Sequence, residues 1–271
     1  CNNYCTYCII PYLRGTIRNK NLNDAIDEIN TLVNNGFKEI VLTGIHTGSY
    51  PDLVNLIKEI SKNKKLERIR ISSIEATEID DDFLEELKNN KKICCHMHIP
   101  VQAACDNTLK KMNRKYDMDR FISIIDKIRE VRPDINITTD LIVGFPTETE
   151  EDFLESYNNA SKIKFGKIHV FPYSKRDGTV AAKMKSVLSD SEKKERTHKM
   201  IELSNKLENE YYNKFLGKTL NVLVEEVFDD YSTGHTDNYI KVIINSNLEH
   251  NKDYNVKIIK IDGVNVYGEV E

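Results

Sequence analysis

Three cysteines stand close together at the start of the chain, at positions 1, 5 and 8. Thiolates bind iron–sulfur clusters, and three thiolates on a four-iron cluster leave one iron without a protein ligand. That open iron can chelate a small molecule. The spacing of Cys1, Cys5 and Cys8 therefore predicts a [4Fe-4S] cluster with one iron free for chemistry.

A structural zinc ion is the alternative for these cysteines, because thiolates also bind zinc. Zinc takes four ligands and usually binds cysteines in CxxC pairs, so a histidine would have to complete the set. The candidates are His46, His96 and His98. The other cysteines fall in or next to a strand pattern, where buried structural thiols are a better expectation than a second cluster. They are Cys94, Cys95 and Cys105. The spacing favours the cluster over zinc.

The segment that contains the first three cysteines, residues 1–11, is followed by Arg14, Gly15 and Arg18 and resembles the methylthiotransferase branch of the radical S-adenosylmethionine (SAM) family. The resemblance covers essentially the whole chain and continues in residues 42–50, 70–75, 140–146 and 169–174. The segments 44–48 and 169–174 are most similar to bacterial enzymes that methylthiolate N6-threonylcarbamoyladenosine at tRNA position 37. Residues 234–242 resemble part of an RNA-binding TRAM domain.

This resemblance implies cofactors, a fold and partners. The cofactors are a [4Fe-4S] cluster and SAM, whose amino and carboxylate groups occupy the open iron before an electron from the cluster cleaves the sulfonium. The fold is an incomplete (β/α)6 barrel followed by a TRAM barrel. Family members also carry an N-terminal domain with a second [4Fe-4S] cluster, so we expect this chain to be a fragment. The implied substrate is tRNA, and the implied electron donor is a reductant protein such as flavodoxin or ferredoxin.

Strand-like and helix-like patterns alternate along the first part of the chain. Helices are predicted at 22–33, 52–61, 81–89, 119–131 and 150–161, and strands at 39–43, 68–73, 94–101, 136–143 and 167–171. Such alternation predicts a parallel sheet with helices on its outer face. Repeated right-handed crossovers curl that sheet into a full or partial α/β barrel.

A long charged helix is predicted at 189–215, and beyond Gly217 apolar residues alternate with polar ones in short runs. Alternation of period two, broken by turn residues, predicts a small antiparallel β-barrel. We therefore place a radical SAM core with its C-terminal helix at 1–215 and a TRAM-like RNA-binding barrel at 216–271.

Active sites of α/β barrels form at the carboxyl ends of the strands, so the residues there are the candidates for binding SAM. They are Thr43, Gly44, Ser73, Glu75 and Gln102, and the family resemblance implies in addition an adenine contact by the backbone around Val143. A loop turn is the structural alternative at the first two positions, and capping of the next helix is the alternative at Ser73 and Glu75. The family usually has Ser-Gly after Gln102, whereas this chain has Ala103-Ala104. Without glycine, a positive φ or a close backbone approach to a ligand is harder.

The formal net charge of −4 gives no overall attraction to nucleic acid, so RNA contacts must come from local groups. Arg14, Arg18 and Arg114 lie in basic clusters that can neutralise phosphates, although charge runs alone slightly favour a solvated helix face. In the C-terminal barrel, Tyr239 and Lys241 would contact RNA by stacking and by phosphate pairing.

No apolar run approaches the roughly 20 residues that cross a bilayer, and no secretory signal pattern is present. Six cysteines in 271 residues are too few for a disulfide framework, so we expect a cytoplasmic, reducing environment. The leading hypothesis is an enzyme that adds a methylthio group to C2 of a modified tRNA adenosine. The alternatives are a methylthiotransferase of another branch, acting on isopentenyladenosine tRNA or a ribosomal protein, and a non-catalytic RNA-binding protein with a structural metal.

Overall fold

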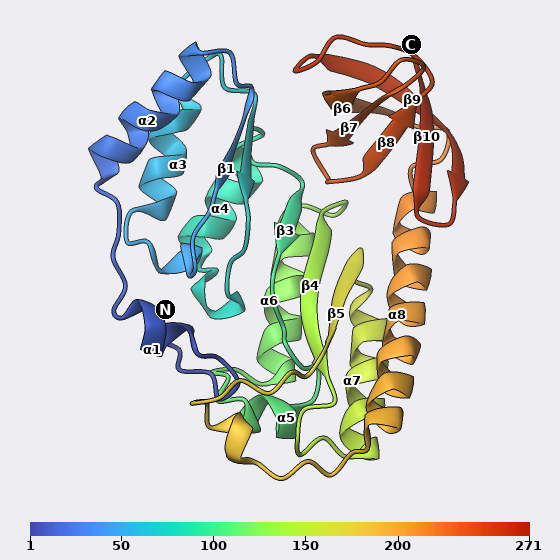
Figure 1. Ribbon diagram of the computed structural model, residues 1–271. Helices are drawn as coiled ribbons and strands as arrows, with labels where there is room; N and C mark the ends of the chain where they lie inside the picture. Colours follow the sequence, from blue (N-terminus) through green and yellow to red (C-terminus); the bar gives the residue numbers. More distant parts are fainter.

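The first body of the fold is built on five parallel strands that curl into a partial barrel (Figure 1). The computed structural model describes residues 1–271. The strands are β1 (Glu39–Leu42), β2 (Arg68–Ile71), β3 (His96–His98), β4 (Asn136–Val143) and β5 (Lys167–Pro172). β1 pairs with β2, β4 lies between β3 and β5, and a bridge from Ile69 to Ile93 connects the two pieces. The predicted partial α/β barrel is confirmed.

The third strand is shorter than the predicted 94–101. Regular pairing is limited to β3, and single bridges at Ile93 and Gln102 replace it on either side. Pro100 lies in the second gap and has no backbone N–H to donate to a neighbouring strand. The chain therefore leaves the regular ladder shortly before Gln102.

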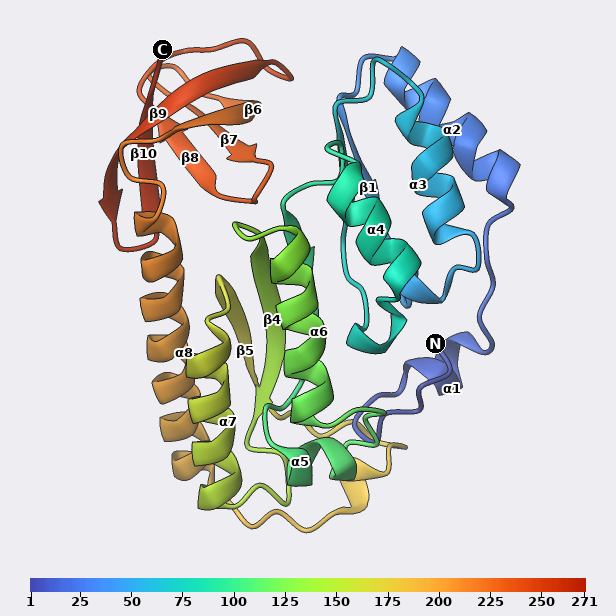
Figure 2. The same ribbon diagram turned by 180° about the vertical axis from the view of Figure 1, so that it is seen from behind.

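Helices cover the outer face of the sheet, as the alternating pattern predicts (Figure 2). They are α2 (Leu22–Asn34), α3 (Leu53–Ser61), α4 (Asp81–Asn89), α6 (Met118–Val131) and α7 (Glu150–Ile163). The sequence pattern does not predict the short helices α1 (Ile10–Arg14) and α5 (Asp106–Lys111), because five and six residues are too few to show a period of 3.6. Three 3₁₀ turns complete this body: η1 (Thr47–Ser49), η2 (Ala76–Glu78) and η3 (Ala181–Lys183).

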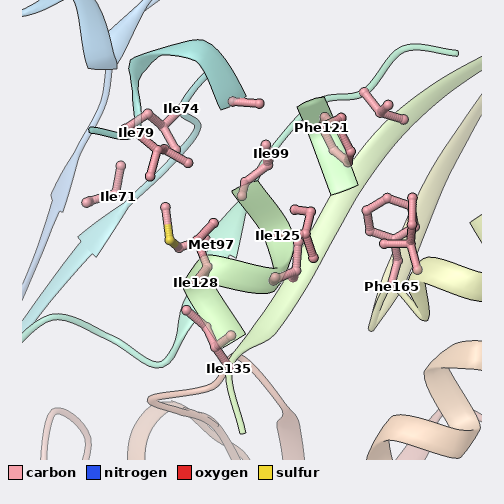
Figure 3. Packing of buried hydrophobic residues seen from close by; sticks show 14 of the residues in the cluster. Ile71, Ile74, Ile79, Met97, Ile99, Phe121, Ile125, Ile128, Ile135 and Phe165 are labelled. Atoms are coloured by element: carbon pink, nitrogen blue, oxygen red, sulfur yellow. The ribbon is translucent and has the colours of Figure 1, made fainter. Parts of the chain in front are cut away.

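The main hydrophobic core fills the space between the sheet and these helices. Figure 3 shows Phe121, Ile125 and Ile128 of α6 packed near Met97 and Ile99, and all five side chains are buried. Burying one such side chain contributes about 1.5–3 kcal/mol. This packing fixes the strands, and with them the loops that follow each strand.

Helix α8 (Asp190–Asn213) lies beside β5 and continues towards the small barrel (Figure 1). The hydroxyl of Ser204 accepts a hydrogen bond from the backbone N–H of Ile168 at 3.0 Å and donates one to its carbonyl at 2.9 Å. These are the backbone groups that a strand edge leaves unpaired. The helix therefore covers the edge of the sheet at β5.

The second body is a closed barrel of five strands. They are β6 (Thr219–Val227), β7 (Ser232–Thr236), β8 (Lys241–Ile244), β9 (Asp253–Asp262) and β10 (Asn265–Val270). The barrel was predicted to be antiparallel, but β10 and β8, which close it, run parallel. Gly234 is required at the crossing of β6 and β7, because a Cβ there would stand 2.1 Å from the carbonyl oxygen of Leu223.

Polar contacts attach the small barrel to the amino ends of the parallel strands, while α1 and the chain start lie at the opposite, carboxyl ends (Figure 1). Arg68 on β2 donates to Asn221 Oδ1 at 2.6 Å and to Asp253 at 2.9 Å. Asn136 on β4 donates to the carbonyl of Asn238 at 2.9 Å. The small barrel thus closes one end of the partial barrel, and the cysteine segment lies at the other.

Each body has its own group of buried apolar side chains. Helix α8 contributes Leu207 to the first group and Tyr211 to the second. The domain boundary at residue 216 stays a prediction, and it falls just after the helix that serves both groups. None of the helices has the length and apolar character that spanning a membrane requires.

Candidate functional site

The cysteine segment is held against the loops at the carboxyl ends of the strands. The N–H of Thr6 donates to the carbonyl of Met112 at 3.0 Å, and its hydroxyl donates to the carbonyl of Lys111 at 2.8 Å. The carbonyl of Thr6 accepts from the N–H of Ala181 at 2.8 Å. Contacts from two distant parts of the chain therefore position the segment between Cys5 and Cys8.

All three cysteines of this segment are free thiols. Cys5 is buried, and Cys1 and Cys8 are half-buried. No group of three His, Cys, Asp or Glu side chains in the chain is arranged to hold a single metal ion, and this holds for the three cysteines as well as for His46, His96 and His98. Three free thiols on one eight-residue segment do match the donor set of a four-iron cluster, in which each thiolate binds a different iron.

Arg114 and Glu75 lie directly beside Cys5. The guanidinium of Arg114 donates to both carboxylate oxygens of Glu75, to the carbonyl of Pro100 at 3.0 Å and to the hydroxyl of Tyr116 at 2.8 Å. Its Nη1 also stands 3.6 Å from the sulfur of Cys5. The arrangement places a positive charge and a carboxylate next to a predicted cluster ligand.

These contacts correct the prediction that Arg114 meets RNA phosphates. Its side chain is only 3% exposed, and its donors are engaged inside the protein. Glu75 also caps the turn η2 in a reciprocal capping box with Glu78. The capping alternative for Glu75 is thus realised together with its position at the cysteine segment.

A cavity of about 510 Å³ is lined by residues that were predicted as a cluster ligand, as SAM contacts and as phosphate contacts. Its lining includes Cys1, Thr43 and Gly44, and also Arg14 and Arg18. Its volume lies within the range of about 300–1,000 Å³ that suits small-molecule ligands. The two arginines are exposed and take part in no ion pair, so they remain free to bind an anion.

The other predicted SAM residues lie at the same ends of the strands. Gln102 adopts φ +66°, with its N–H bonded to the carbonyl of Asp140 at 2.9 Å and its carbonyl accepting from Ile142 at 2.8 Å. A non-glycine residue with positive φ is uncommon and concentrates at functional sites. Ala103 and Ala104 are buried. The positive φ is adopted by Gln102 and by neither alanine.

Val143 and Ser73 have different surroundings. Val143 is buried, and its carbonyl already accepts a hydrogen bond from the N–H of Tyr173 at 2.8 Å. A carbonyl has a second lone pair, so a backbone contact to a ligand remains feasible there. Ser73 is half-buried, and its hydroxyl makes no hydrogen bond within the protein.

Sequence reasoning missed a polar group on the inner face of β3, β4 and β5. The hydroxyl of Thr138 stands 2.9 Å from His98 Nδ1, and Asp140 stands 3.4 Å from His98 Nε2. The rings of His98 and His169 are 5.6 Å apart. His169 is flanked by apolar residues in the sequence, but Thr139 next to Thr138 interrupts the alternation, so the pattern predicted strands and gave no sign of this polar group.

Tyr239 lies at the contact between the two bodies. Its ring stacks on His96 and on His235, with 4.7 Å between ring centroids in each case, and the guanidinium of Arg70 lies 4.6 Å from its centroid. These contacts occupy part of the ring, but Tyr239 is still 45% exposed, so its stacking on RNA bases stays a prediction. Lys241 is exposed and pairs with Glu226 at 2.9 Å, which leaves its RNA role a prediction.

The remaining cysteines are kept away from reactive chemistry by burial. Cys94 and Cys105 are buried, and burial raises the pKa of each thiol to about 12. Cys95 is half-buried, and burial raises its pKa to about 11. These thiols therefore stay protonated near neutral pH and make poor metal ligands.

Comparison with known proteins identifies relatives for nearly the full chain. A family model described as the radical SAM superfamily matches residues 1–160. The threonylcarbamoyladenosine tRNA methylthiotransferase MtaB of Bacillus subtilis is 42% identical over 273 residues, covering 96% of this chain and 60% of that protein. A tRNA-2-methylthio-N(6)-dimethylallyladenosine synthase of Acetivibrio thermocellus is 42% identical over 246 residues, covering 87% of this chain and 51% of that protein. The chain thus spans 51–60% of the length of these two relatives.

Solved structures with the same fold are more distant in sequence. Coproporphyrinogen III oxidase (HemN) from Escherichia coli has a TM-score of 0.56 at 18% identity, covering 76% of this chain and 50% of that chain. The radical SAM methyltransferase TsrM from Kitasatospora setae has a TM-score of 0.58 at 18% identity, covering 67% and 37%. At this identity the likeness shows the fold alone.

Proposed function

Because the chain belongs to the radical SAM superfamily, we propose that it is the core of a methylthiotransferase that modifies tRNA. The proposed reaction adds a methylthio group to C2 of N6-threonylcarbamoyladenosine at position 37. The observation that carries the proposal is the set of three free thiols at the carboxyl ends of the barrel strands, in a chain 42% identical to methylthiotransferases of two branches.

The residues around the cysteine segment have distinct proposed roles. Cys1, Cys5 and Cys8 would hold a [4Fe-4S] cluster, which when bound would chelate SAM at its open iron and supply the electron that cleaves it. Glu75, held beside Cys5 by Arg114, would present a carboxylate to the amino-acid part of SAM. Both are already positioned by buried contacts, which reduces the ordering cost of binding.

The remaining strand-end residues would surround the rest of SAM. Thr43 and Gly44 line the large cavity together with Cys1. Ser73 offers a hydroxyl without a protein partner, and Gln102 offers an amide on a backbone of unusual conformation. The backbone at Val143 would contact the adenine.

Sulfur donation requires a second component. The thiols of Cys94, Cys95 and Cys105 stay protonated near neutral pH and are unsuited to a second cluster within residues 1–271. We therefore assign the second [4Fe-4S] cluster to a further domain, as in the family that the sequence resembles. A reductant protein such as flavodoxin or ferredoxin would supply electrons, in a cytoplasmic setting. Without the second component, residues 1–271 should cleave SAM without forming the methylthio product.

Anaerobic reconstitution of residues 1–271 with iron and sulfide tests this proposal. We expect a brown protein that releases 5′-deoxyadenosine from SAM when reduced. The substitution Cys5→Ala should abolish both the iron content and SAM cleavage, whereas the control Cys95→Ala should retain them. A colourless zinc protein that binds RNA would instead support the non-catalytic alternative.

The substrate requires a separate measurement, because relatives from the two branches are equally similar. Mass spectrometry of tRNA nucleosides from a deletion strain should show loss of 2-methylthio-N6-threonylcarbamoyladenosine. Loss of the methylthio derivative of isopentenyladenosine would assign the chain to the other tRNA branch. Unchanged tRNA together with an unmethylthiolated ribosomal protein would assign it to the third branch.

A further inference from the structure

The face of β3, β4 and β5 that points into the partial barrel carries polar side chains, which are not part of the hydrophobic core. Thr138 Oγ1 contacts His98 Nδ1 at 2.9 Å and also His96 Nε2 at 3.0 Å, so one hydroxyl orients two imidazoles. Asp140 stands 3.4 Å from the other nitrogen of His98. The neighbouring positions on β4 that point to the opposite face are buried in the core. The polar positions therefore face the interior of the partial barrel.

His169 is the member of this group with free hydrogen-bonding capacity. Its side chain is exposed and makes no hydrogen bond or ion pair, although its ring lies 5.6 Å from that of His98. The surrounding protein removes part of the water around the ring, and this, followed by the neighbouring His98, lowers the pKa of His169. Near neutral pH the ring is therefore mainly neutral and offers one donor and one acceptor.

The deeper end of this interior is closed. Tyr239 from the small barrel stacks on His96, and Arg70 lies over the same ring. Arg70 is neutralised by Glu39, with 2.6 Å between its Nε and the carboxylate. A ligand that enters from the cysteine end would therefore reach His98 and His169 before it reaches the stacked rings of His96 and Tyr239.

An apolar surface adjoins the histidines on the side of the cysteine segment. Phe171 follows His169 on the same face of β5 and is 50% exposed, and Ile142 lies beside it on β4. Two residues along a strand span about 7 Å. A purine ring against Phe171 would therefore place a substituent several ångströms long next to the two histidines.

We infer that His169, placed beside His98, determines specificity by hydrogen-bonding the hydroxyl or carboxylate of a threonylcarbamoyl group on a tRNA adenosine. This inference rests on the proposed function and selects between its two tRNA branches. A dimethylallyl group offers no hydrogen-bonding atom, so it would cover His98, Asp140 and His169 without replacing their water. Burying polar groups without partners is unfavourable, and this disfavours the apolar substrate.

Equilibrium binding to anticodon stem-loop RNAs tests the inference without requiring catalysis. Three RNAs differ only at position 37, which carries N6-threonylcarbamoyladenosine, N6-dimethylallyladenosine or adenosine. We expect residues 1–271 to bind the first RNA about tenfold more tightly than the other two, since hydrogen bonds to a charged group contribute at least this much. His169→Phe should remove the preference without weakening the binding of the unmodified RNA.

The control is His198→Phe, which makes the same replacement at an exposed position on α8 and should leave all three affinities unchanged. Circular dichroism of each variant checks that the fold is retained. A wild-type preference for the dimethylallyl RNA, or a preference that survives His169→Phe, would overturn the inference while leaving tRNA methylthiolation intact. Absence of binding to any of the three RNAs would contradict the inference together with the proposed tRNA substrate.

Discussion

At Arg114, a side chain that is typical of a phosphate contact in the sequence is part of a buried network in the structure. Its sequence neighbours Lys110 and Lys115 are exposed, and the local run of charge gives no sign that Arg114 differs from them. Its partner Glu75 stands 39 residues earlier in the chain. Long-range pairing of this kind cannot be derived from local composition, because the two loops meet only when the barrel forms.

The network at Arg114 predicts a stability effect that a surface arginine would not show. Arg114→Met leaves Glu75 without its partner and should lower the free energy of unfolding by about 3 kcal/mol. Arg14→Met, at an exposed arginine without an ion pair, should change it by less than about 0.5 kcal/mol. Urea unfolding of the apoprotein measures both values. Equal effects of the two substitutions would show that the Arg114 contacts do not hold the site together.

Residues whose chemistry depends on spacing were easier to predict than residues whose role depends on tertiary contacts. The three cysteines, and Thr43 with Gly44 at a strand end, follow from motif spacing and the rule for barrel strands. The structure brings Cys1 into one cavity with both of these strand-end residues. The positive φ of Gln102 was not predicted, because amino-acid type alone favours a negative φ there.

At the scale of elements, α8 has a function that its charge pattern does not reveal. The sequence predicts a long charged helix that leaves the sheet, whereas the structure shows Ser204 bonded to both backbone groups of Ile168. A serine on a helix does not indicate which face of the helix is buried, so the contact of Ser204 with β5 could not be predicted from the sequence. The helix thus protects the edge strand β5, which carries His169 and Phe171.

Replacing Ser204 should therefore loosen β5 selectively. Ser204→Ala removes only the hydroxyl and leaves the N–H and carbonyl of Ile168 buried without partners, at a cost of about 1–3 kcal/mol for each group. We expect faster amide hydrogen exchange across β5 and little change in β1. Ser191→Ala, at an exposed position on the same helix, is the matched control. Unchanged exchange at Ile168 would mean that α8 does not protect this edge.

The strand pattern predicted the kind of sheet better than its details. The alternation of helices and strands correctly predicted that β1 to β5 run parallel, because each helical crossover returns the chain in the same direction. The parallel closure of β10 on β8 was not predicted, since short alternating runs look the same whichever direction a strand takes. Period two reports which face is buried and carries no information on strand direction.

At the scale of the whole molecule, the two bodies are joined by charged groups taken out of water. Arg68 is 7% exposed and Asp253 is 13% exposed, and Lys38 adds a second contact to Asp253 at 3.0 Å. Arg68 also donates to the carbonyls of Asn221 and His235 in the small barrel. Breaking a buried pair on one side is strongly destabilising, so these contacts oppose separation of the bodies.

Replacement of Arg68 should uncouple the small barrel from the parallel sheet. Arg68→Met removes every hydrogen bond that this guanidinium makes to the small barrel, and should weaken the contact by about 3 kcal/mol because carbonyl and carboxylate acceptors are left buried. We expect the wild-type chain to unfold in one calorimetric transition and the variant in two, with β6 and β9 exchanging amide hydrogens before β4. Lys260→Met breaks the exposed pair with Asp262 in the same barrel and should leave one transition. A single transition in Arg68→Met, with unchanged exchange in β6 and β9, would show that the remaining contacts and α8 couple the two bodies without Arg68.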